Sequence, residues 1–209
     1  MGTGVLGGSF DPVHHGHLIA ADRAAEALGL DRVLFVPCAK QPLKPAGPVA
    51  AADDRRAMLA LALAGHPHFV LEPMELERPG PSFTVDTLRA LRGRAPDERL
   101  VLILGADAVV ELPRWRAADE VARLAEVAVL TRPGVSEMAS AFVKHYVATP
   151  AIEISASEIR ARCLAGKSIR YLVPDAVAEY IARRGLYQGA DAKTPGRRGS
   201  AGQTHSGPG

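Results

Sequence analysis

The sequence predicts an α/β protein in which helices cover both faces of a mainly parallel sheet. Apolar runs of strand length alternate along the chain with segments whose apolar residues recur every three or four positions. The runs "VLFV" and "LVLIL" consist of Val, Leu, Ile and Phe, which is typical of strands buried on both faces. Ligands of such sheets bind beyond the carboxyl ends of the strands, so the residues after each strand are the first candidates for a site.

Each predicted strand is a short apolar run that stops at a turn signal, such as Pro37 or the Pro-Gly pair after Arg132. The runs of this kind are residues 3–8, 32–37, 68–73, 99–107 and 126–134, and residues 151–166 begin with a sixth. The longest apolar run, within 99–107, is expected to be a central strand. These strands are expected to form one sheet.

Each predicted helix carries one apolar side, and several have boundary signals such as the cap-type Ser82, the stop signal Gly29 and the first-turn Pro174. The helices are expected over residues 17–30, 51–65, 82–96 and 174–187, and over the second half of 151–166. Residues 38–52 are rich in Pro, Gly and Lys, and we interpret them as a long functional loop.

The 209 residues suffice for one domain with a sizeable core but are few for two. We therefore predict one domain over residues 1–188 and a disordered tail over 189–209, which contains no Val, Ile, Leu, Met or aromatic residue. The tail holds three basic residues and one acid, so it accounts for the whole net charge of +2. A neutral body gives no support to nucleic-acid binding. Deleting residues 190–209 is expected to change neither activity nor solubility much.

Cysteine usage and hydropathy point to the cytoplasm. Cys38 and Cys163 are far apart and show no metal-like spacing, so a disulfide framework is not expected. The sequence shows no signal peptide and no apolar run of about 18 residues, so no membrane contact is predicted. The oligomeric state stays open, a homo-oligomer included.

The first stretch that carries chemistry is "GGSFDPVHHGH", which follows a predicted strand and precedes a helix. Gly7 and Gly8 allow positive φ and leave room for a ligand to approach the backbone. The start of a helix offers unpaired N–H groups and a partial positive charge, which favour anions. His14 and His17 are three positions apart and can face one ligand, whereas His15 points elsewhere. Together these features indicate a phosphate site.

Other interpretations of this stretch stay open from the residues alone. Histidines where a loop meets a helix can be simple caps or packing residues. They can also bind zinc, although no cysteine or carboxylate pattern nearby completes such a site. A dinucleotide-binding turn fits poorly, because the glycines do not follow the G-x-G-x-x-G spacing.

This stretch resembles the G-x-F-D-P-x-H-x-G-H signature of the nucleotidyltransferase superfamily, which contains adenylyltransferases and cytidylyltransferases. The resemblance implies a Rossmann-like, doubly wound fold that binds ATP at this turn, with His14 and His17 as the H-x-G-H pair. The ATP-binding residues that it implies here are Gly7, Gly8, Ser9, Phe10, His14 and His17.

A second motif of that superfamily, I-S-S-T-x-x-R, resembles "ISASEIR" near the end of this chain. The resemblance adds Ile154, Ser155, Ser157 and Arg160 to the ATP-binding residues, and makes Arg160 catalytic together with His14 and His17. Hydroxyls at the start of a helix can cap it, and an arginine can bind phosphate oxygens with two donors. Ala156 departs from the pattern, which usually has a second serine there. Taken alone, the stretch could be an ordinary helix cap with a solvated arginine.

The middle of the chain resembles the bacterial nicotinate-nucleotide adenylyltransferases through "GPSFTVDTLRAL", "GADAVVELPRW" and "RPG". The substrate-binding residues that this resemblance implies are Lys44, Thr84, Val85, Asp107, Trp115, Arg116 and Arg132. Asp107 follows the longest predicted strand and can accept hydrogen bonds from a ribose. Trp115 offers a flat face to a pyridine ring, and the N–H groups of Val85 and Arg116 can bind a carboxylate. Without the resemblance, Trp115 would more often be a core residue, and Asp107 would be a helix cap as often as a ligand-binding residue.

The loop after the second predicted strand departs from the family pattern. Relatives often read P-P-H-K where this chain reads "QPLK", so Lys44 is kept and Leu43 replaces the histidine. Lys40 is a candidate to compensate for that histidine.

The resemblance implies that ATP and nicotinate mononucleotide react to nicotinate adenine dinucleotide and pyrophosphate, in NAD biosynthesis. The attacking phosphate is mostly dianionic at neutral pH and needs no general base. Catalysis is therefore expected to be positioning and neutralisation of charge by His14, His17 and Arg160. Mg²⁺ is the expected cofactor, held mainly by ATP phosphates, with no protein ligand.

Three alternative functions remain at this point. A nicotinamide-mononucleotide enzyme differs only in one group of its substrate. Phosphopantetheine adenylyltransferases share both motifs but are generally shorter and lack the Trp115 context. A nucleotide-binding regulator without catalysis would not need His14, His17 and Arg160 intact.

Overall fold

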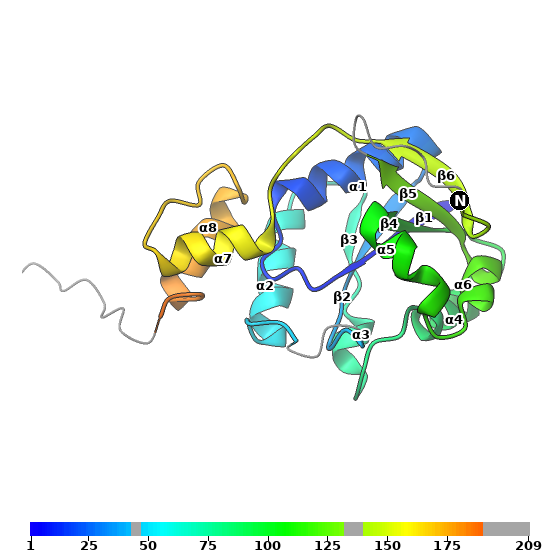
Figure 1. The fold of residues 1–209 in the computed structure, drawn as a ribbon, viewed down its shortest axis with the longest axis horizontal. Helices are drawn as coiled ribbons and strands as arrows, with labels where there is room; N and C mark the ends of the chain where they lie inside the picture. The colour runs from blue at the N-terminus through cyan, green and yellow to red at the C-terminus, as the bar shows by residue number, and fades with distance from the viewer. Residues whose placement is uncertain (43–46, 132–139, 190–209) are drawn as a thin grey trace, which may run out of the picture.

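The computed structural model describes residues 1–42, 47–131 and 140–189. Within these ranges six strands form one parallel sheet in the order β3-β2-β1-β4-β5-β6 (Figure 1). The strands are β1 (Gly2–Gly8), β2 (Arg32–Pro37), β3 (Phe69–Leu71), β4 (Arg99–Gly105), β5 (Glu126–Thr131) and β6 (Val143–Ala148). The chain winds outward from β1 to β3 and then returns to place β4 beside β1. This is the Rossmann-like, doubly wound arrangement, which confirms the predicted fold class.

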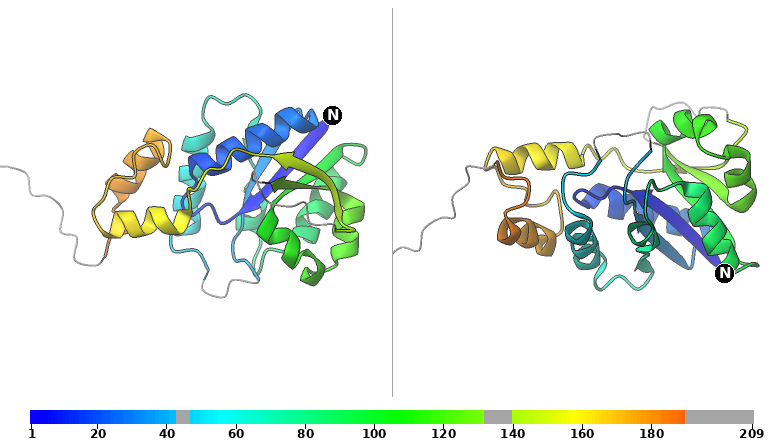
Figure 2. Two further views of the ribbon diagram at one scale, coloured as in Figure 1. Left: turned by 45° about the horizontal axis from the view of Figure 1, so that its top comes forward. Right: turned by 90° about the horizontal axis from the view of Figure 1, so that it is seen from below.

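Helices cover both faces of the sheet (Figure 2). They are α1 (His15–Leu28), α2 (Ala52–Leu63), α3 (Met74–Glu77), α4 (Thr84–Arg94), α5 (Ala106–Glu111), α6 (Ala118–Leu124), α7 (Ala156–Leu164) and α8 (Asp175–Arg184), with a short 3₁₀ turn at Leu112–Arg114. Successive strand residues alternate between faces: Leu6 packs in the core under α1, α2, α7 and α8, and Val5 in the core under α4 to α6. None of these helices is long and apolar enough to cross a membrane.

Gly29 ends α1, as its position predicts. It adopts the left-handed conformation (φ 58°) in which a side chain would be strained, and the N–H of Leu30 then bonds the Ala25 carbonyl at 2.9 Å. This motif turns the chain from α1 into β2.

The predicted strand at the start of 151–166 is wrong. Residues 151–155 form no strand, and the sixth strand is β6, which pairs with β5 at the edge of the sheet. Ile152 and Ile154 alternate with Glu153 and therefore imitate a strand, but this segment runs across α1 towards α7 (Figure 1). The edge strand escaped prediction because it carries Lys144 and His145 and is only half-buried.

The predicted cap at Ser82 is also wrong. α4 begins at Thr84 with Phe83 at its N-cap. The Ser82 hydroxyl instead accepts the N–H of Ala39 at 3.0 Å, and the Ser82 N–H donates to the Lys40 carbonyl at 2.9 Å. Ser82 therefore ties the loop after β2 to the loop before α4.

The C-terminal helices α7 and α8 lie beside α2 at one end of the sheet (Figures 1 and 2). The Asp54 carboxylate on α2 accepts the Tyr180 hydroxyl at 2.8 Å and Arg184 Nε at 3.1 Å. The N–H of His15, at the start of α1, donates to the Leu172 carbonyl at 3.0 Å. These bonds join α8 to α2, and the segment before α8 to the start of α1. Residues 190–209, most of the predicted tail, lie outside the described residues, so the domain limits stay a prediction.

Candidate active site

The turn between β1 and α1 lies at the carboxyl end of the central strand. Gly7 is exposed, and nothing lies within 4 Å of the point that a Cβ would occupy there, whereas a Cβ on Gly8 would meet the Phe10 ring at 3.1 Å. Neither glycine has a positive φ, contrary to the sequence prediction; the left-handed residue of the turn is Phe10, with φ 47°. Phe10 is almost fully buried, and its ring packs in the core. Ser9 is half-buried.

His14 and His17 come together at the start of α1. Their rings stack with centroids 3.7 Å apart, and the backbone N–H of His14 donates to His17 Nδ1 at 3.2 Å. Because His17 Nδ1 is an acceptor, the ring proton of neutral His17 lies on Nε2. The Phe10 ring packs against the His17 ring with centroids 5.0 Å apart. His17 is therefore held as a hydrogen-bond donor of fixed orientation.

Burial keeps both histidines neutral at neutral pH. Burial, with a smaller contribution from the charge of His15, lowers the pKa of His14 to about 4. Burial and then the proximity of His14 hold the pKa of His17 well below its usual value. The buried Nδ1 of His14 has no hydrogen-bond partner among the described residues. In the free protein the two rings are thus neutral hydrogen-bond donors.

The second motif meets this turn through Arg160 on α7. Arg160 Nη1 donates to the Asp11 carbonyl at 2.7 Å, and Nη2 donates to Ser157 Oγ at 3.1 Å. Ser155 is the N-cap of α7 and accepts the N–H of Glu158 at 3.1 Å. The two motifs, nearly 150 positions apart in the chain, are therefore in direct contact.

Ile154 also belongs to this junction. Its side chain packs against the core under α1, and its carbonyl lies 3.8 Å from the point that a Cβ on Gly16 would occupy. The segment before α7 therefore rests on the first turn of α1.

Asp11 joins three segments at this site, and sequence reasoning missed it. Its buried carboxylate accepts the N–H groups of Val49 and Ala50 at 2.6 and 3.0 Å and the Tyr187 hydroxyl at 2.7 Å. Burial and this bond to Asp11 raise the pKa of Tyr187. The sequence contained a feature that could have identified Asp11, because Asp11 is the aspartate of the F-D-P part of the first motif.

The predicted substrate residues gather beyond β4. Thr84 and Val85 are the first two residues of α4, so their N–H groups have no acceptor within the helix. The Arg116 guanidinium lies 4.8 Å from the centroid of the Phe83 ring and 3.7 Å from an Asp86 oxygen, beside the start of α4. The structure thus brings Arg116, Thr84 and Val85 together.

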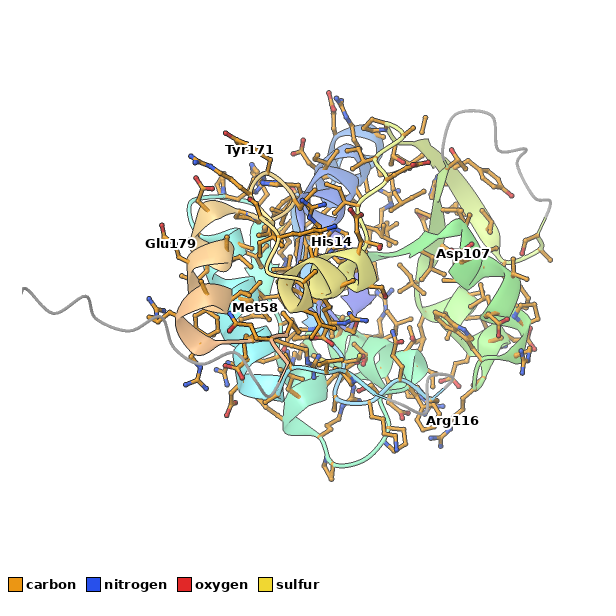
Figure 3. The ribbon with its side chains drawn as sticks, turned by 60° about the vertical axis from the view of Figure 1, so that its left-hand side comes forward. His14, Met58, Asp107, Arg116, Tyr171 and Glu179 are labelled. Atoms are coloured by element: carbon orange, nitrogen blue, oxygen red, sulfur yellow. The ribbon has the colours of Figure 1, made fainter. Side chains whose placement is uncertain are left out.

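Asp107 and Trp115 lie on the same side of the sheet. Asp107 is exposed in the first turn of α5, and Trp115 follows the 3₁₀ turn, half-buried against the core. Figure 3 shows His14 between the C-terminal segment with Tyr171 and the elements with Asp107 and Arg116. Two further predicted residues, Lys44 and Arg132, lie outside the described residues.

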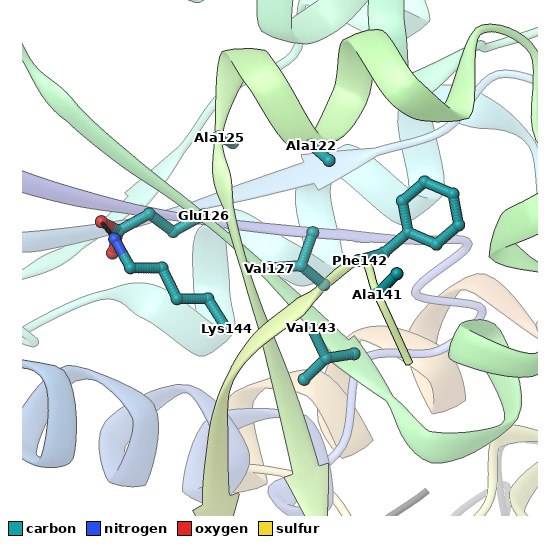
Figure 4. A pocket seen from close by; sticks show the side chains of 8 residues that line it. All are labelled: Ala122, Ala125, Glu126, Val127, Ala141, Phe142, Val143 and Lys144. Atoms are coloured by element: carbon teal, nitrogen blue, oxygen red, sulfur yellow. Dashed lines mark hydrogen bonds and ion pairs between the residues drawn. The ribbon is translucent and has the colours of Figure 1, made fainter. Parts of the chain in front are cut away.

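Among the described residues, no group of three or more His, Cys, Asp or Glu side chains is placed to hold a metal ion. A hollow of about 370 Å³ lies between α6 and the starts of β5 and β6 (Figure 4). Glu126 and Lys144 line it, but none of the predicted site residues does.

The fold and this junction of two motifs define a class of protein. The model of the cytidylyltransferase-like family matches residues 5–162. The nicotinic acid mononucleotide adenylyltransferase of Plasmodium falciparum, solved in complex with NaAD, has a similar fold with a TM-score of 0.73. It is 17% identical in sequence, and the match covers 89% of this chain and 97% of that chain.

Closer relatives narrow the class. A probable nicotinate-nucleotide adenylyltransferase of Thermomicrobium roseum is 43% identical over 201 residues, which cover 92% of this chain and 94% of that protein. One from Thermus thermophilus is 46% identical over 190 residues, which cover 90% of this chain and 100% of that protein. The chain belongs to the nicotinate-nucleotide adenylyltransferase family.

Proposed function

We propose that this protein transfers the adenylyl group of ATP to nicotinate mononucleotide, forming nicotinate adenine dinucleotide and pyrophosphate. One observation carries the proposal: Arg160 of the second motif is bonded to the turn that holds His14 and His17. This turn lies beyond β1, beside the elements that carry Arg116 and Asp107. ATP and the mononucleotide would therefore occupy neighbouring parts of the same sheet edge.

The reaction needs donors and not a base. A phosphate oxygen of the mononucleotide attacks the α-phosphorus of ATP, and the bond from that phosphorus to the bridging oxygen of pyrophosphate breaks. The attacking phosphate is already ionised. His17 could not serve as its base, because Nδ1 is occupied by the N–H of His14 and Nε2 carries the proton.

The histidines and the arginine bind different parts of ATP. His17 donates Nε2–H to the α-phosphate, where negative charge builds up in the transition state. Arg160, His14 and the hydroxyls of Ser155 and Ser157 bind the triphosphate. Gly7, Gly8 and the backbone of Ser9 and Phe10 let the phosphates approach the turn, and Ile154 shapes its edge.

On the mononucleotide side, the N–H groups at the start of α4 and at Arg116 bind the nicotinate carboxylate. Trp115 covers the pyridine ring, Asp107 accepts from a ribose hydroxyl, and Thr84 and Val85 form the start of α4. Lys44 and Arg132 complete this set by resemblance.

Mg²⁺ enters with ATP as part of the substrate. The Asp11 carboxylate, which belongs to the first motif, already accepts three hydrogen bonds from the chain. The histidine and arginine N–H groups and the serine hydroxyls of the proposed site are hydrogen-bond donors, which suit phosphate oxygens. The ion is therefore held by ATP phosphates and water.

A pyrophosphate-release assay tests the proposal. The full chain with MgATP is offered nicotinate mononucleotide, nicotinamide mononucleotide or phosphopantetheine in separate reactions. We expect the highest kcat/KM with nicotinate mononucleotide, and a product with the mass of nicotinate adenine dinucleotide. A higher kcat/KM with either other acceptor would replace the proposed substrate, and no release with any of them would favour a nucleotide-binding regulator.

A further inference from the structure

Arg55 on α2 is a buried cation that the reaction described above does not use. Only 2% of the residue is exposed. No ion pair joins its guanidinium to a carboxylate among the described residues, and its Nε makes no hydrogen bond there. A buried charge without a counter-charge is costly, so its hydrogen bonds must matter to the structure or to a ligand.

The hydrogen bonds of Arg55 lie at the tips of two adjacent strands. Its Nη1 donates to the Ser9 carbonyl, just after β1, and to the Cys38 carbonyl, just after β2, both at 2.8 Å. The N–H of Cys38 also donates to the Gly8 carbonyl at 2.9 Å, which extends the pairing of the two strands. One guanidinium nitrogen therefore fixes the first carbonyl beyond each strand.

These bonds set the direction of the N–H groups that follow. In a planar trans peptide the carbonyl and the next N–H point in opposite directions. The Cys38 carbonyl faces Arg55, and the N–H of Ala39 accordingly reaches the Ser82 hydroxyl at 3.0 Å on the other side. The Ser9 carbonyl also faces Arg55, so the N–H of Phe10 points away from it. That N–H has no acceptor among the described residues.

The N–H of Phe10 is thus an oriented donor without an acceptor, in the turn that the proposed function assigns to the ATP phosphates. Phe10 adopts φ 47°, a conformation that most side chains avoid and that surrounding contacts must maintain. Its ring is anchored against Phe35 and His17, at centroid distances of 5.7 and 5.0 Å. Arg55 holds the other end of the same peptide.

We propose that Arg55 is a positioning residue for ATP: it fixes the Ser9–Phe10 peptide so that the Phe10 N–H donates to a phosphate oxygen. Its buried positive charge also adds to the potential that draws a polyphosphate to this turn. The inference rests on the proposed function only in so far as ATP binds here, and it does not depend on the acceptor.

The test compares two arginines that use the same chemistry at opposite ends of the sheet. Arg92 Nη1 also bridges two backbone carbonyls, of Pro96 and Glu98 at 2.7 Å each, but these precede β4. Arg55→Met and Arg92→Met remove the donors and keep an unbranched apolar side chain. Both are expected to lower the melting temperature. Only Arg55→Met is expected to weaken ATP binding, measured by titration calorimetry, about tenfold, the effect of losing one hydrogen bond to a charged group.

Kinetics supply a second readout that a purely structural role would not move. Arg55→Met is expected to raise KM for ATP about as much as it weakens binding, with KM for nicotinate mononucleotide changed less than about threefold. ATP affinity equal to that of the unaltered chain in a folded Arg55→Met variant would overturn the proposal. So would equal weakening by Arg92→Met, because the effect would then be general.

If Arg55→Met does not fold, nuclear magnetic resonance on the ¹⁵N-labelled chain tests the proposal instead. Adding ATP is expected to shift the amide signal of Phe10, and to shift it less in Arg55→Lys, which keeps the charge but not the guanidinium geometry. An unmoved Phe10 signal, or equal shifts in both chains, overturns the proposal. ATP titrations need no second substrate. They therefore test the role of Arg55 in ATP binding even if the pyrophosphate assay shows no activity with any acceptor. A chain that binds no ATP would refute both.

Discussion

His14 and His17 stack on one another in a turn where burial holds both pKa values below neutral pH. The roles that we propose for them rest on hydrogen-bond geometry and not on charge. The N–H of His14 fixes the ring of His17, and the neighbouring Arg160 carries a permanent charge. Binding of a polyphosphate would raise both histidine pKa values, because an anion favours the protonated ring.

Replacing His17 by alanine removes one donor whose direction is fixed before the substrate binds. We expect kcat to fall at least ~100-fold, the usual effect of losing such a donor. Pyrophosphate release measures it, and His15→Ala is the matched control, since the described contact of His15 to Leu172 uses only its backbone. A kcat within a few-fold of normal in a folded His17→Ala chain would remove His17 from the reaction.

The lowered pKa of His14 makes stability depend on pH. Between pH 6.5 and about 4 the unfolded chain binds a proton at this ring that the folded chain does not. The contribution is therefore complete above pH 6.5 and is lost as the pH falls towards 4, by roughly 3 kcal/mol in all.

Urea unfolding at pH 7 and pH 4.5 measures this dependence. In His14→Gln the free energy of unfolding is expected to change less between the two pH values than in the unaltered chain. An identical change in both would show that His14 titrates in the folded protein as it does in a peptide.

Some residues of the site could be predicted from the sequence, and others could not. The two histidines and Arg160 stand in motifs of fixed spacing, so their meeting was predictable. Arg55 lies in "DDRR", which looks like the solvated side of a helix, and only the fold reveals that Arg55 is buried while Arg56 is exposed.

Among the elements, strands of the sheet interior were predicted well because both of their faces are apolar. β2 occupies the predicted residues, Arg32–Pro37. The edge strand β6 needs only one partner and one half-buried face, so its sequence carries little signal. Short helices such as α3 and α6 also escaped prediction, because one or two turns show too few apolar repeats.

The segment after α8 acts on the first motif through one hydroxyl. Tyr187→Phe removes the hydrogen bond to the buried Asp11 carboxylate and leaves the ring in place. We expect the free energy of unfolding to fall by about 2 kcal/mol, as for a bond to a charged acceptor. Urea unfolding measures this, with Tyr171→Phe as control, because Tyr171 is 77% exposed. Equal effects of both substitutions would contradict a specific role for the Tyr187 hydroxyl.

On the scale of the whole molecule, the proposed site lies at the carboxyl ends of the strands, and a cluster of ion pairs lies at their amino ends. At the amino ends of the strands, Glu126 binds Arg99, Lys144 and His145. Burial alone would raise the pKa of Glu126, but the bonds from Lys144, His145 and Arg99 lower it to about 2. This cluster joins β4, β5 and β6 far from the two motifs.

Glu126→Gln tests the cluster. Because the folded pKa is lowered, the contribution of Glu126 is complete above its unfolded pKa near 4.5 and is lost as the pH falls towards 2. We expect a loss of about 1 kcal/mol at pH 7, or roughly 2–4 °C in melting temperature. The difference from the unaltered chain should shrink at pH 3. A difference that stays constant between pH 7 and pH 3 would assign the effect to packing.

The bond between Arg160 and the Asp11 carbonyl spans 149 positions of the chain, and that of Tyr187 to Asp11 spans 176. Translation delivers these partners in order, so the first motif leaves the ribosome long before the second exists. At the usual rates this interval lasts roughly ten seconds or more. A nascent chain that has emerged only as far as β5 holds the first motif but lacks Arg160 and Tyr187, the partners of Asp11. The proposed ATP site can therefore form only after both motifs have been synthesised.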